Sequence, residues 1–208
     1  MGGYRVSDSM RCYFSLDENH KVAKVNLGGG FGIPYYAHEE ELDIVRVGNF
    51  LCESIDTRRR WLQEIRFCVE SGRYLVGECG IYVCKVRYRK ESRGETFLIV
   101  DGGMHHHLAA SGNFGQVVRR NYPIAVLGKI GHDPVEEVNI VGPLCTPMDR
   151  LGSQVALPRA DVGDLVAIFS SGAYGLSASP TYFLGHPEPA EVIVKTDIHT
   201  GVPSPSGA

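Results

Sequence analysis

A glycine-rich loop directly after a short apolar run is the first candidate for chemistry in this sequence. The run Val25-Asn26-Leu27 precedes Gly28, Gly29 and Gly30, and Gly32 follows closely. Glycine has no Cβ, so backbone N–H groups in such a loop can approach an anion closely, as they do in phosphate-binding loops. The loop lacks the GxxxxGK[ST] and GxGxxG patterns of nucleotide sites. Two interpretations therefore stay open, a phosphate site and an ordinary turn at the end of a strand.

A carboxylate and a guanidinium form the second candidate, in the tetrapeptide Glu70-Ser71-Gly72-Arg73. We expect a tight turn at the end of a strand, with the two charged groups on its opposite sides. Arginine binds phosphate through charge-assisted hydrogen bonds, and a carboxylate can hold a ring nitrogen protonated. The pair would suit a ligand with a cationic nitrogen and an anionic phosphate. The alternative is a mutual salt bridge at the surface.

Two further loops present reactive groups. Cys145 lies in a proline-stiffened loop, with Asp149 four residues later. A loop thiol can act as a proton donor or nucleophile, although free cysteines are commonly small buried apolar residues. Tyr174 lies in a glycine-flanked turn, where its hydroxyl could donate to a phosphate or merely close the turn.

The run His105-His106-His107 suggests a metal site, but its spacing argues against one. We expect an extended segment, in which consecutive side chains point alternately to opposite faces. No acid or thiol stands at a recognisable zinc spacing from the run. The sequence therefore predicts no metal.

The elements that position the first two candidates form a strand, helix and strand within residues 1–80. Strands are predicted over 21–27 and 65–70, with a helical segment between them that is broken near Gly48 and continues over 58–63. In parallel α/β sheets and barrels, ligand groups lie at the carboxyl ends of strands. The glycine loop and Glu70 are therefore expected at the same edge.

Residues 81–195 are predicted to form an antiparallel β domain. From Gly80 onward the chain changes to short β-rich runs divided by turns. These runs are residues 81–88, 96–100, 135–141, 154–157, 164–169 and 191–194. The Pro/Gly/Ser-rich residues 196–208 are predicted to be disordered.

Composition narrows the class of protein. The 208 residues are 43% hydrophobic and 22% charged, which is ordinary for a soluble globular chain. A net charge of −3 gives no reason to expect nucleic acid or an anionic membrane as partner. Six irregularly spaced cysteines indicate reduced thiols, and there is no apolar run of membrane-spanning length and no signal segment. We expect a cytoplasmic protein.

Five segments, taken in order, resemble the pyridoxal-phosphate-dependent decarboxylases of ornithine, diaminopimelate and arginine, which have the alanine-racemase-like fold. The segments are NLGGGFGIPY, ESGRYLVGECG, VDGGMHHHLAASGNFGQ, GPLCTPMDRLG and GAYGLSASP. YLVGECGIYV and HHHLAASGNFGQ are most similar to the subgroup associated with exosortase and exopolysaccharide gene clusters. The resemblance implies the C-terminal part of a TIM-like (β/α)8 barrel, followed by an antiparallel β-barrel or sandwich domain.

The resemblance also implies a cofactor site for pyridoxal phosphate. The matching positions are Gly28, Gly29, Gly30, Glu70, Arg73 and Tyr174. In the family, the glycine amides bind the cofactor phosphate, and the arginine and tyrosine complete its site. The glutamate faces the pyridine nitrogen and keeps the ring an electron sink.

On the reaction side, Cys145 resembles the cysteine that reaches across a dimer interface and protonates the carbanion left after decarboxylation. Asp101, Thr146 and Asp149 are expected near the substrate. Thr146 stands where diaminopimelate decarboxylases carry an acid, and the segment after His107 lacks their arginine and tyrosine for the distal carboxylate. Diaminopimelate is therefore not the expected substrate.

One part of the family's active site has no match. Its Schiff-base lysine lies on an early barrel strand, whereas this sequence is expected to begin near the seventh strand. We expect the C-terminal portion of a homodimeric decarboxylase of a basic or diamino acid, in polyamine or lysine biosynthesis, that is inactive alone. One alternative is a non-catalytic homologue that binds a full-length enzyme, and another is a free-standing β module.

Overall fold

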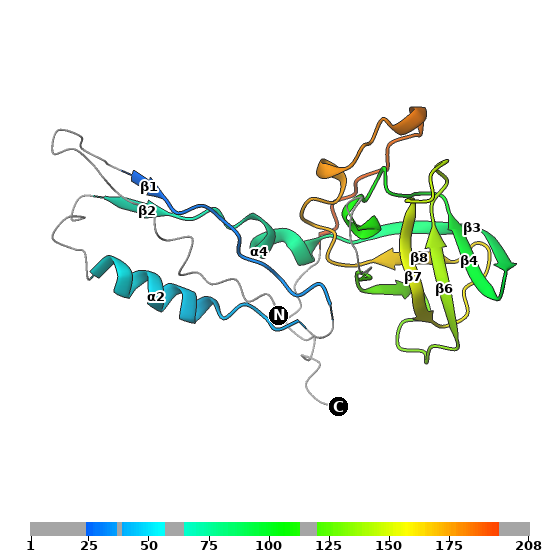
Figure 1. Cartoon of the computed structure of the whole chain (residues 1–208), viewed down its shortest axis with the longest axis horizontal. Helices are drawn as coiled ribbons and strands as arrows, with labels where there is room; N and C mark the ends of the chain where they lie inside the picture. Colours follow the sequence, from blue (N-terminus) through cyan, green and yellow to red (C-terminus); the bar gives the residue numbers. More distant parts are fainter. Residues whose placement is uncertain (1–23, 37–38, 57–64, 113–119, 196–208) are drawn as a thin grey trace. The chain divides into compact units, whose positions relative to one another are not determined.

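The computed structural model describes residues 24–36, 39–56, 65–112 and 120–195 (Figure 1). Predicted strand residues 21–23, the predicted helical residues 58–63 and the predicted disordered tail lie outside these ranges. The chain divides into two compact units between Gly77 and Glu78, close to the expected domain boundary after residue 80.

The N-terminal unit contains the predicted pair of parallel strands. Strand β1 (Lys24–Asn26) lies beside β2 (Arg66–Cys68), and helix α2 (Ile44–Asp56) falls between them in the sequence (Figure 1). The helix continues through Gly48, so the predicted break was wrong. A single glycine costs a helix only about 1 kcal/mol, which is too little to interrupt a longer amphipathic segment.

A short helix replaces the tight turn expected at residues 70–73. Helix α4 (Gly72–Val76) begins after Ser71, which holds the N-cap position without a side-chain cap hydrogen bond, and the 3-10 turn η1 (Gly77–Cys79) follows it. Arg73 therefore lies in the first turn of a helix. Serine is a favoured residue at this position, and the sequence interpretation did not consider a cap there.

The C-terminal unit is built on a six-stranded sheet with the order β5-β8-β3-β4-β6-β7. Its strands are β3 (Tyr82–Ser92), β4 (Glu95–Val100), β5 (Ile124–Val126), β6 (Glu136–Val141), β7 (Arg150–Leu157) and β8 (Leu165–Ile168). The sequence interpretation missed β5. The strand predicted over 191–194 is an exposed segment without strand pairing.

One pair of neighbouring strands departs from the predicted antiparallel pattern. β4 and β6 run parallel, with Leu98 opposite Ile140, whereas the other pairs in this sheet are antiparallel. A parallel pair requires a long crossover, and residues 101–135 supply it. Local alternation of apolar residues carries no information about the direction of the partner strand.

The sheet curls so that its two edge strands come close together. The Asn121 side chain, in the segment that leads into β5, bonds to β7: its Nδ2 donates to the Ser153 carbonyl at 2.7 Å, and its Oδ1 accepts from the Ser153 amide at 2.9 Å. A Cβ built on Gly152 would lie 3.1 Å from the Ile124 side chain. One amide side chain therefore satisfies backbone groups that a sheet edge would otherwise leave open.

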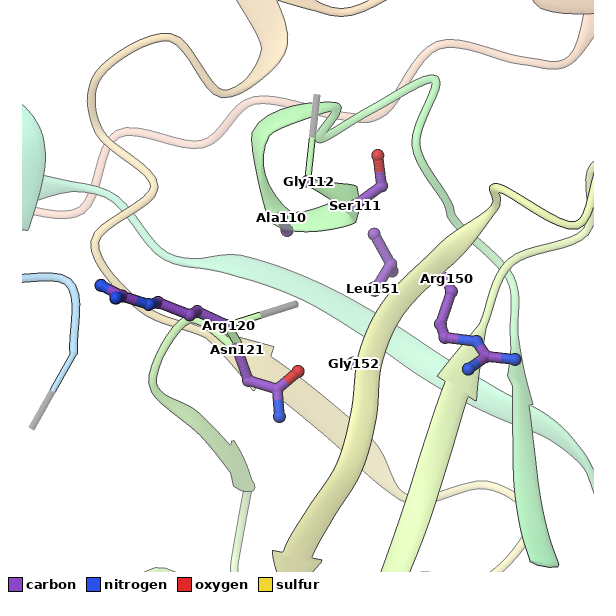
Figure 2. A pocket seen from close by; sticks show the side chains of 8 residues that line it. All are labelled: Ala110, Ser111, Gly112, Arg120, Asn121, Arg150, Leu151 and Gly152. Carbon is purple, nitrogen blue, oxygen red and sulfur yellow. The ribbon is translucent and has the colours of Figure 1, made fainter. Parts of the chain in front are cut away.

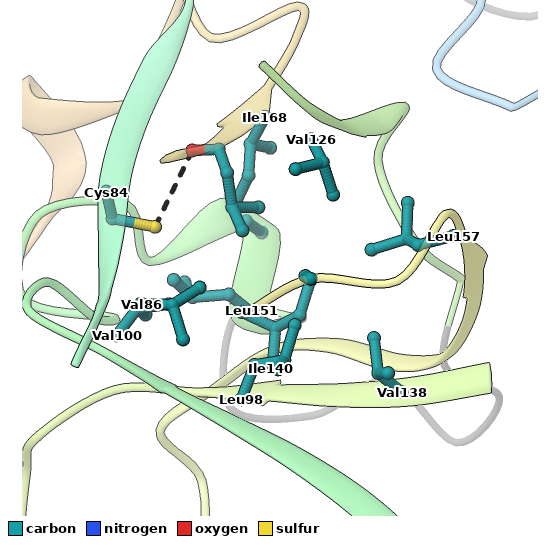
Figure 3. Close-up of a cluster of buried hydrophobic side chains, with 13 residues drawn as sticks. Cys84, Val86, Leu98, Val100, Val126, Val138, Ile140, Leu151, Leu157 and Ile168 are labelled. Atoms are coloured by element: carbon teal, nitrogen blue, oxygen red, sulfur yellow. Dashed lines mark hydrogen bonds between the residues drawn. The ribbon is translucent and has the colours of Figure 1, made fainter. Parts of the chain in front are cut away.

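Buried apolar side chains fill the inside of this curled sheet (Figure 3). Cys84 and Val86 point inward, while Lys85 and Arg87 between and after them are exposed, as the two-residue period of a strand requires. The apolar side chains with the least exposure are Leu98, Val138, Ile140, Leu151, Ala160, Val166, Ala167 and Ile168. None of the described helices has the length and apolar character needed to cross a membrane.

Candidate functional site

Each of the three glycines after β1 is required for a backbone reason. Gly28 (φ +78°) and Gly30 (φ +93°) adopt left-handed conformations that side chains disfavour. A Cβ on Gly29 would lie 2.5 Å from the Glu70 carbonyl oxygen. A Cβ on Gly28 or Gly30 would meet nothing within 4 Å, so the loop borders open space.

Two amides of this loop are available to an anion. The Gly28 amide donates to Asn26 Oδ1 at 2.8 Å. Within the described parts of the chain, the amides of Gly29 and Gly30 donate no hydrogen bond. Successive unengaged N–H groups in a tight loop form an anion-binding concavity. The loop therefore fits a phosphate group.

Glu70 follows β2 and is tied to the same loop. Its amide donates to the Gly28 carbonyl at 2.7 Å, and its Oε1 accepts from Asn26 Nδ2 at 2.5 Å. The predicted meeting of the glycine loop and Glu70 at one edge of the strands is confirmed. The sequence interpretation missed Asn26, although an amide side chain directly before the glycines can both donate and accept, and this was the available signal.

Arg73 is held over an aromatic ring. Its guanidinium carbon lies 5.6 Å from the centroid of Tyr35, within the range of a cation–π contact. Gly77 has no room for a Cβ because the Ile33 side chain lies against it. The loop after the glycines and α4 thus pack together, which places Arg73 in the same unit as the glycine loop and Glu70.

In the C-terminal unit, Asp149 joins two loops. Its side chain is buried, with Oδ1 accepting from the Met104 amide at 2.7 Å and Oδ2 from the Leu144 amide at 2.8 Å. Neither Gly103 nor Gly142 could carry a Cβ without overlapping this carboxylate. Burial raises the pKa of Asp149, against the opposite effect of the two amides. The carboxylate therefore connects the loop that begins at residue 101 with the loop that carries residues 145 and 146.

The remaining predicted reaction-side residues are accessible to different degrees. Cys145 is exposed, so the alternative that it is a buried apolar residue is wrong. Thr146 is partly buried, and its Oγ1 accepts from the Met148 amide at 3.3 Å. Asp101 is exposed, and its Oδ1 accepts from the Lys85 amide at 2.8 Å. Tyr174 is 55% exposed.

The histidine run forms a turn and not the extended segment that we expected. The amides of His106 and His107 both donate to the Gly103 carbonyl, at 2.9 and 3.1 Å, and all three histidines are buried. His106 also contacts the Tyr82 hydroxyl at 3.1 Å. Burial lowers the pKa of His105 and of His107 to about 4, so both are neutral at pH 7. Among the described residues, no group of histidine, cysteine and acidic side chains could hold a metal ion.

A small hollow of about 180 Å³ lies near Asn121, where the segment before β5 meets β7 (Figure 2). Its lining residues are Ala110, Ser111, Gly112, Arg120, Asn121, Arg150, Leu151 and Gly152. This space is continuous with solvent and encloses no room for a ligand of ordinary size. None of the predicted site residues lines it.

Comparison with known proteins assigns both units to one kind of enzyme. The family model for the pyridoxal binding domain of pyridoxal-dependent decarboxylases matches residues 6–77, and that for their C-terminal sheet domain matches residues 67–172. The L-glutamyl-[BtrI acyl-carrier protein] decarboxylase of Niallia circulans is 51% identical over 176 residues, which cover 81% of this chain and 40% of the relative.

More distant relatives agree. The diaminopimelate decarboxylase of Bacillus subtilis is 34% identical over 178 residues, which cover 84% of this chain and 39% of the relative. The crystal structure of diaminopimelate decarboxylase from M. jannaschii in complex with L-lysine has a TM-score of 0.71 at 29% identity, and the match covers 83% of this chain and 38% of that one. The chain thus spans about two fifths of the length of the curated relatives that it matches.

Proposed function

Because this chain belongs to the family of pyridoxal-dependent decarboxylases, we propose that it forms the C-terminal portion of an enzyme that removes the carboxyl group of an amino acid. The observation that carries the proposal is the glycine loop, in which two amides are engaged by no described residue, joined to the Glu70 carboxylate. When bound, pyridoxal phosphate supplies a sink for the electron pair that departing carbon dioxide leaves behind.

In this proposal the N-terminal unit holds the cofactor at two points. The amides of Gly29 and Gly30 donate to its phosphate, and the Arg73 guanidinium adds positive charge to that end. The Glu70 carboxylate holds the proton on the ring nitrogen. A fixed anion at this nitrogen keeps the ring positively charged, which is the condition for it to accept electrons.

The C-terminal unit supplies the remaining groups. By its resemblance to the family's tyrosine, Tyr174, on an exposed turn, is the candidate in this unit for binding the cofactor phosphate. The exposed Cys145 thiol gives its proton to the carbon that has lost its carboxyl group. We also propose a homodimer, in which Cys145 of one chain donates its proton at the cofactor site of the other chain. A cytoplasmic location agrees with the free thiols of the described cysteines.

We consider two classes of substrate. The first is the basic or diamino acid expected from the family. The second is a glutamyl group joined to a carrier protein, and it is favoured by the higher identity to the glutamyl-carrier decarboxylase, 51% against 34% for a diaminopimelate decarboxylase.

The second class also has a chemical argument. Decarboxylation beside the amine requires a free α-carboxyl group, so a glutamyl group must be joined to its carrier through the side-chain carboxyl. The distal end of such a substrate carries no charge. The neutral Thr146, and the lack of an arginine over residues 108–116, agree with an uncharged distal end.

Cofactor binding is the direct test of the proposed function. The full chain is mixed with pyridoxal phosphate, and bound cofactor is measured by equilibrium dialysis and by absorbance before and after desalting. We expect saturable binding that is lost in Glu70→Gln combined with Arg73→Ala. Absence of saturable binding by the wild-type chain would contradict the proposal. A band that survives desalting would show that the chain has its own covalent lysine anchor.

The substrate and the alternative role are tested together. Release of carbon dioxide is measured with lysine, ornithine, meso-diaminopimelate and glutamyl-carrier protein, for the chain alone and mixed with a full-length relative. Release of carbon dioxide from glutamyl-carrier protein, and from none of the three free amino acids, would support the second substrate class. A stable complex in which Cys145→Ala does not alter turnover would favour a non-catalytic binding partner.

A further inference from the structure

Asn26 occupies the last position of β1 and contacts both halves of the proposed cofactor site. We propose that it is a positioning residue that holds the Glu70 carboxylate in place for the ring nitrogen and withdraws the Gly28 amide from the phosphate donors. This inference rests on the proposed function, because it concerns how one side chain positions the groups that would bind the two ends of the cofactor.

Three hydrogen bonds carry the inference, and together they close a circuit between the ends of the two strands. The Asn26 Nδ2 donates to Glu70 Oε1 at 2.5 Å, and the Gly28 amide donates to Asn26 Oδ1 at 2.8 Å. The Glu70 amide then donates to the Gly28 carbonyl at 2.7 Å. An amide side chain carries its donor and its acceptor on separate atoms, so it can donate to a carboxylate and accept from a backbone N–H group at the same time.

The circuit selects which groups remain for a ligand. On the phosphate side, the Gly28 amide is engaged, and the amides of Gly29 and Gly30 are not engaged by any described residue. On the ring side, Oε1 of Glu70 is engaged, whereas its Oε2 has no hydrogen bond within the described ranges. The groups left over are one carboxylate oxygen for a ring nitrogen and two amides for a phosphate.

A purely local role for Asn26 would explain only half of these contacts. An asparagine that accepts from the N–H group two residues later forms an Asx-turn, which stabilises many loops. That turn uses Oδ1 alone. The donation from Nδ2 reaches a residue 44 positions away in the sequence and fixes a charged group that the turn itself does not need.

Asn26→Asp separates the two roles. A carboxylate can still accept from the Gly28 amide, so the turn is kept. It cannot donate to Glu70, and it places a second negative charge beside it. Asn49→Asp is the matched control, since Asn49 is exposed on α2 in the same unit and adds the same charge.

The test uses the full chain and measures pyridoxal phosphate affinity by equilibrium dialysis across a range of pH. We expect Asn26→Asp to bind about tenfold more weakly or worse at neutral pH, because a charge-assisted hydrogen bond becomes a repulsion. The loss should shrink as the pH falls, because neighbouring carboxylates come to share a proton. Asn49→Asp should follow the wild type. Equal affinity and equal pH dependence in all three chains would overturn the inference.

A measurement without cofactor keeps the inference distinct from the proposed function. In ¹⁵N spectra of the free chain, Glu70→Gln should shift the Asn26 side-chain amide resonances and leave those of Asn121 unchanged. Unshifted Asn26 resonances would overturn the link between the two residues. Shifted resonances in a chain that binds no pyridoxal phosphate would leave the link standing and refute the proposed function.

Discussion

At the residue scale, Gly29 shows how the absence of a Cβ atom allows the glycine loop to approach Glu70 in the proposed cofactor site. Its Cα faces the backbone carbonyl of Glu70, and no side chain could be placed between them. The nearby Gly32 lies in the same loop, yet a Cβ there would meet nothing within 4 Å. A side chain therefore has room at residue 32 but not at residue 29.

We expect Gly29→Ala to damage the loop and Gly32→Ala to leave it intact. The added Cβ at residue 29 would lie 2.5 Å from a backbone oxygen, so the strand ends must separate, at a cost of about 1–3 kcal/mol. Pyridoxal phosphate affinity should fall about tenfold or more. Dialysis measures the affinity, and thermal unfolding reports the stability. Matching affinities for the two variants would contradict this account.

Asp149 is the second case at this scale. Because its pKa is raised from 3.8 by burial, the contribution of its protonated form to stability is fully present below pH 3.8 and is lost as the pH rises through the folded-state value. At neutral pH its carboxylate still accepts from two backbone amides. Removing one acceptor should therefore leave a buried N–H group unsatisfied.

Asp149→Asn should lower the free energy of unfolding by about 1–3 kcal/mol at neutral pH. The variant should also increase the alkylation rate of Cys145, whose loop Asp149 holds. Urea unfolding measures the first effect, and peptide-resolved mass spectrometry the second. Asp133→Asn, at an exposed position, is the control. An alkylation rate equal to that of the control would show that Asp149 does not hold the Cys145 loop.

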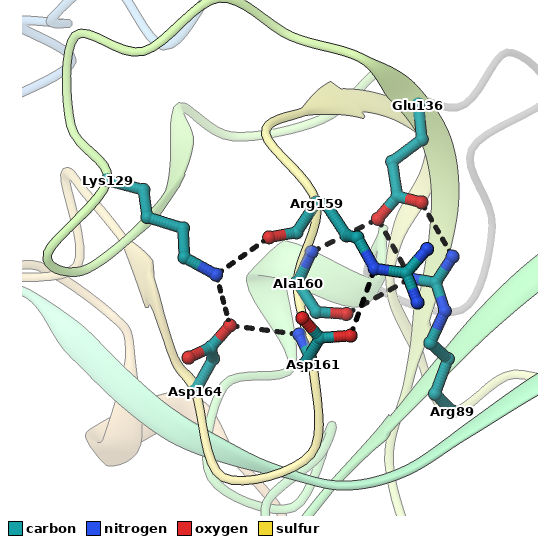
Figure 4. Close-up of polar contacts among 7 residues, drawn as sticks. All are labelled: Arg89, Lys129, Glu136, Arg159, Ala160, Asp161 and Asp164. Carbon is teal, nitrogen blue, oxygen red and sulfur yellow. Dashed lines mark hydrogen bonds and ion pairs between the residues drawn. The ribbon is translucent and has the colours of Figure 1, made fainter.

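At the element scale, polar contacts fix the end of β3 against β6 and the loop before β8 (Figure 4). Arg89 donates through both terminal nitrogens to Glu136, at 2.8 and 2.6 Å, and also to the Ala160 carbonyl at 3.0 Å. The pair is 14% and 16% exposed. By contrast, the Arg159–Asp161 pair is 62% and 55% exposed, and such pairs contribute little.

We expect Arg89→Lys to destabilise the C-terminal unit by about 1–3 kcal/mol, because a lysine cannot make the two-pronged contact. Arg159→Lys should change stability by under about 1 kcal/mol. The hydrogen bond from Arg89 lowers the pKa of Glu136 below 4.5. The stabilisation is therefore present above pH 4.5 and lost as the pH falls through the lower folded-state value. Urea unfolding at several pH values checks both, and equal losses in the two variants would contradict the assignment.

At the scale of the whole molecule, the two units differ in how much they bury. Among the described residues up to 77, only Gly77 is buried, and α2 has none. The C-terminal unit holds the apolar core. Strands of a parallel sheet are normally covered on both faces. In the described part of the N-terminal unit, β1, β2 and the apolar residues of α2 are left uncovered, with Val45 68% exposed.

Limited proteolysis of the full chain should therefore remove the N-terminal unit first. We expect a resistant fragment of about residues 78–195, because its backbone is paired in a curled sheet around a core. Bound pyridoxal phosphate should slow the cleavage of residues 24–77, since a ligand stabilises the state that binds it. Mass spectrometry of the fragments gives the boundary. Equal resistance of both units without cofactor would contradict the difference in burial.

The sequence by itself determined the local features of this protein. Four glycines within five residues predicted a loop with accessible amides, and apolar periods predicted the strand, helix and strand around it. The change to short β-rich runs near residue 80 predicted the second unit. These inferences succeeded because they depend on the conformational preferences of residues that are neighbours in the sequence.

Only the tertiary structure decided which distant residues form hydrogen bonds with one another. Asn26 and Glu70 are 44 positions apart, and Met104 and Asp149 are 45 apart. No periodicity encodes such contacts, and for the same reason the parallel pairing of β4 with β6 could not be predicted. Hydrogen bonds between segments depend on how the strands are brought together, and that arrangement placed the Asn26 side chain between the glycine loop and Glu70.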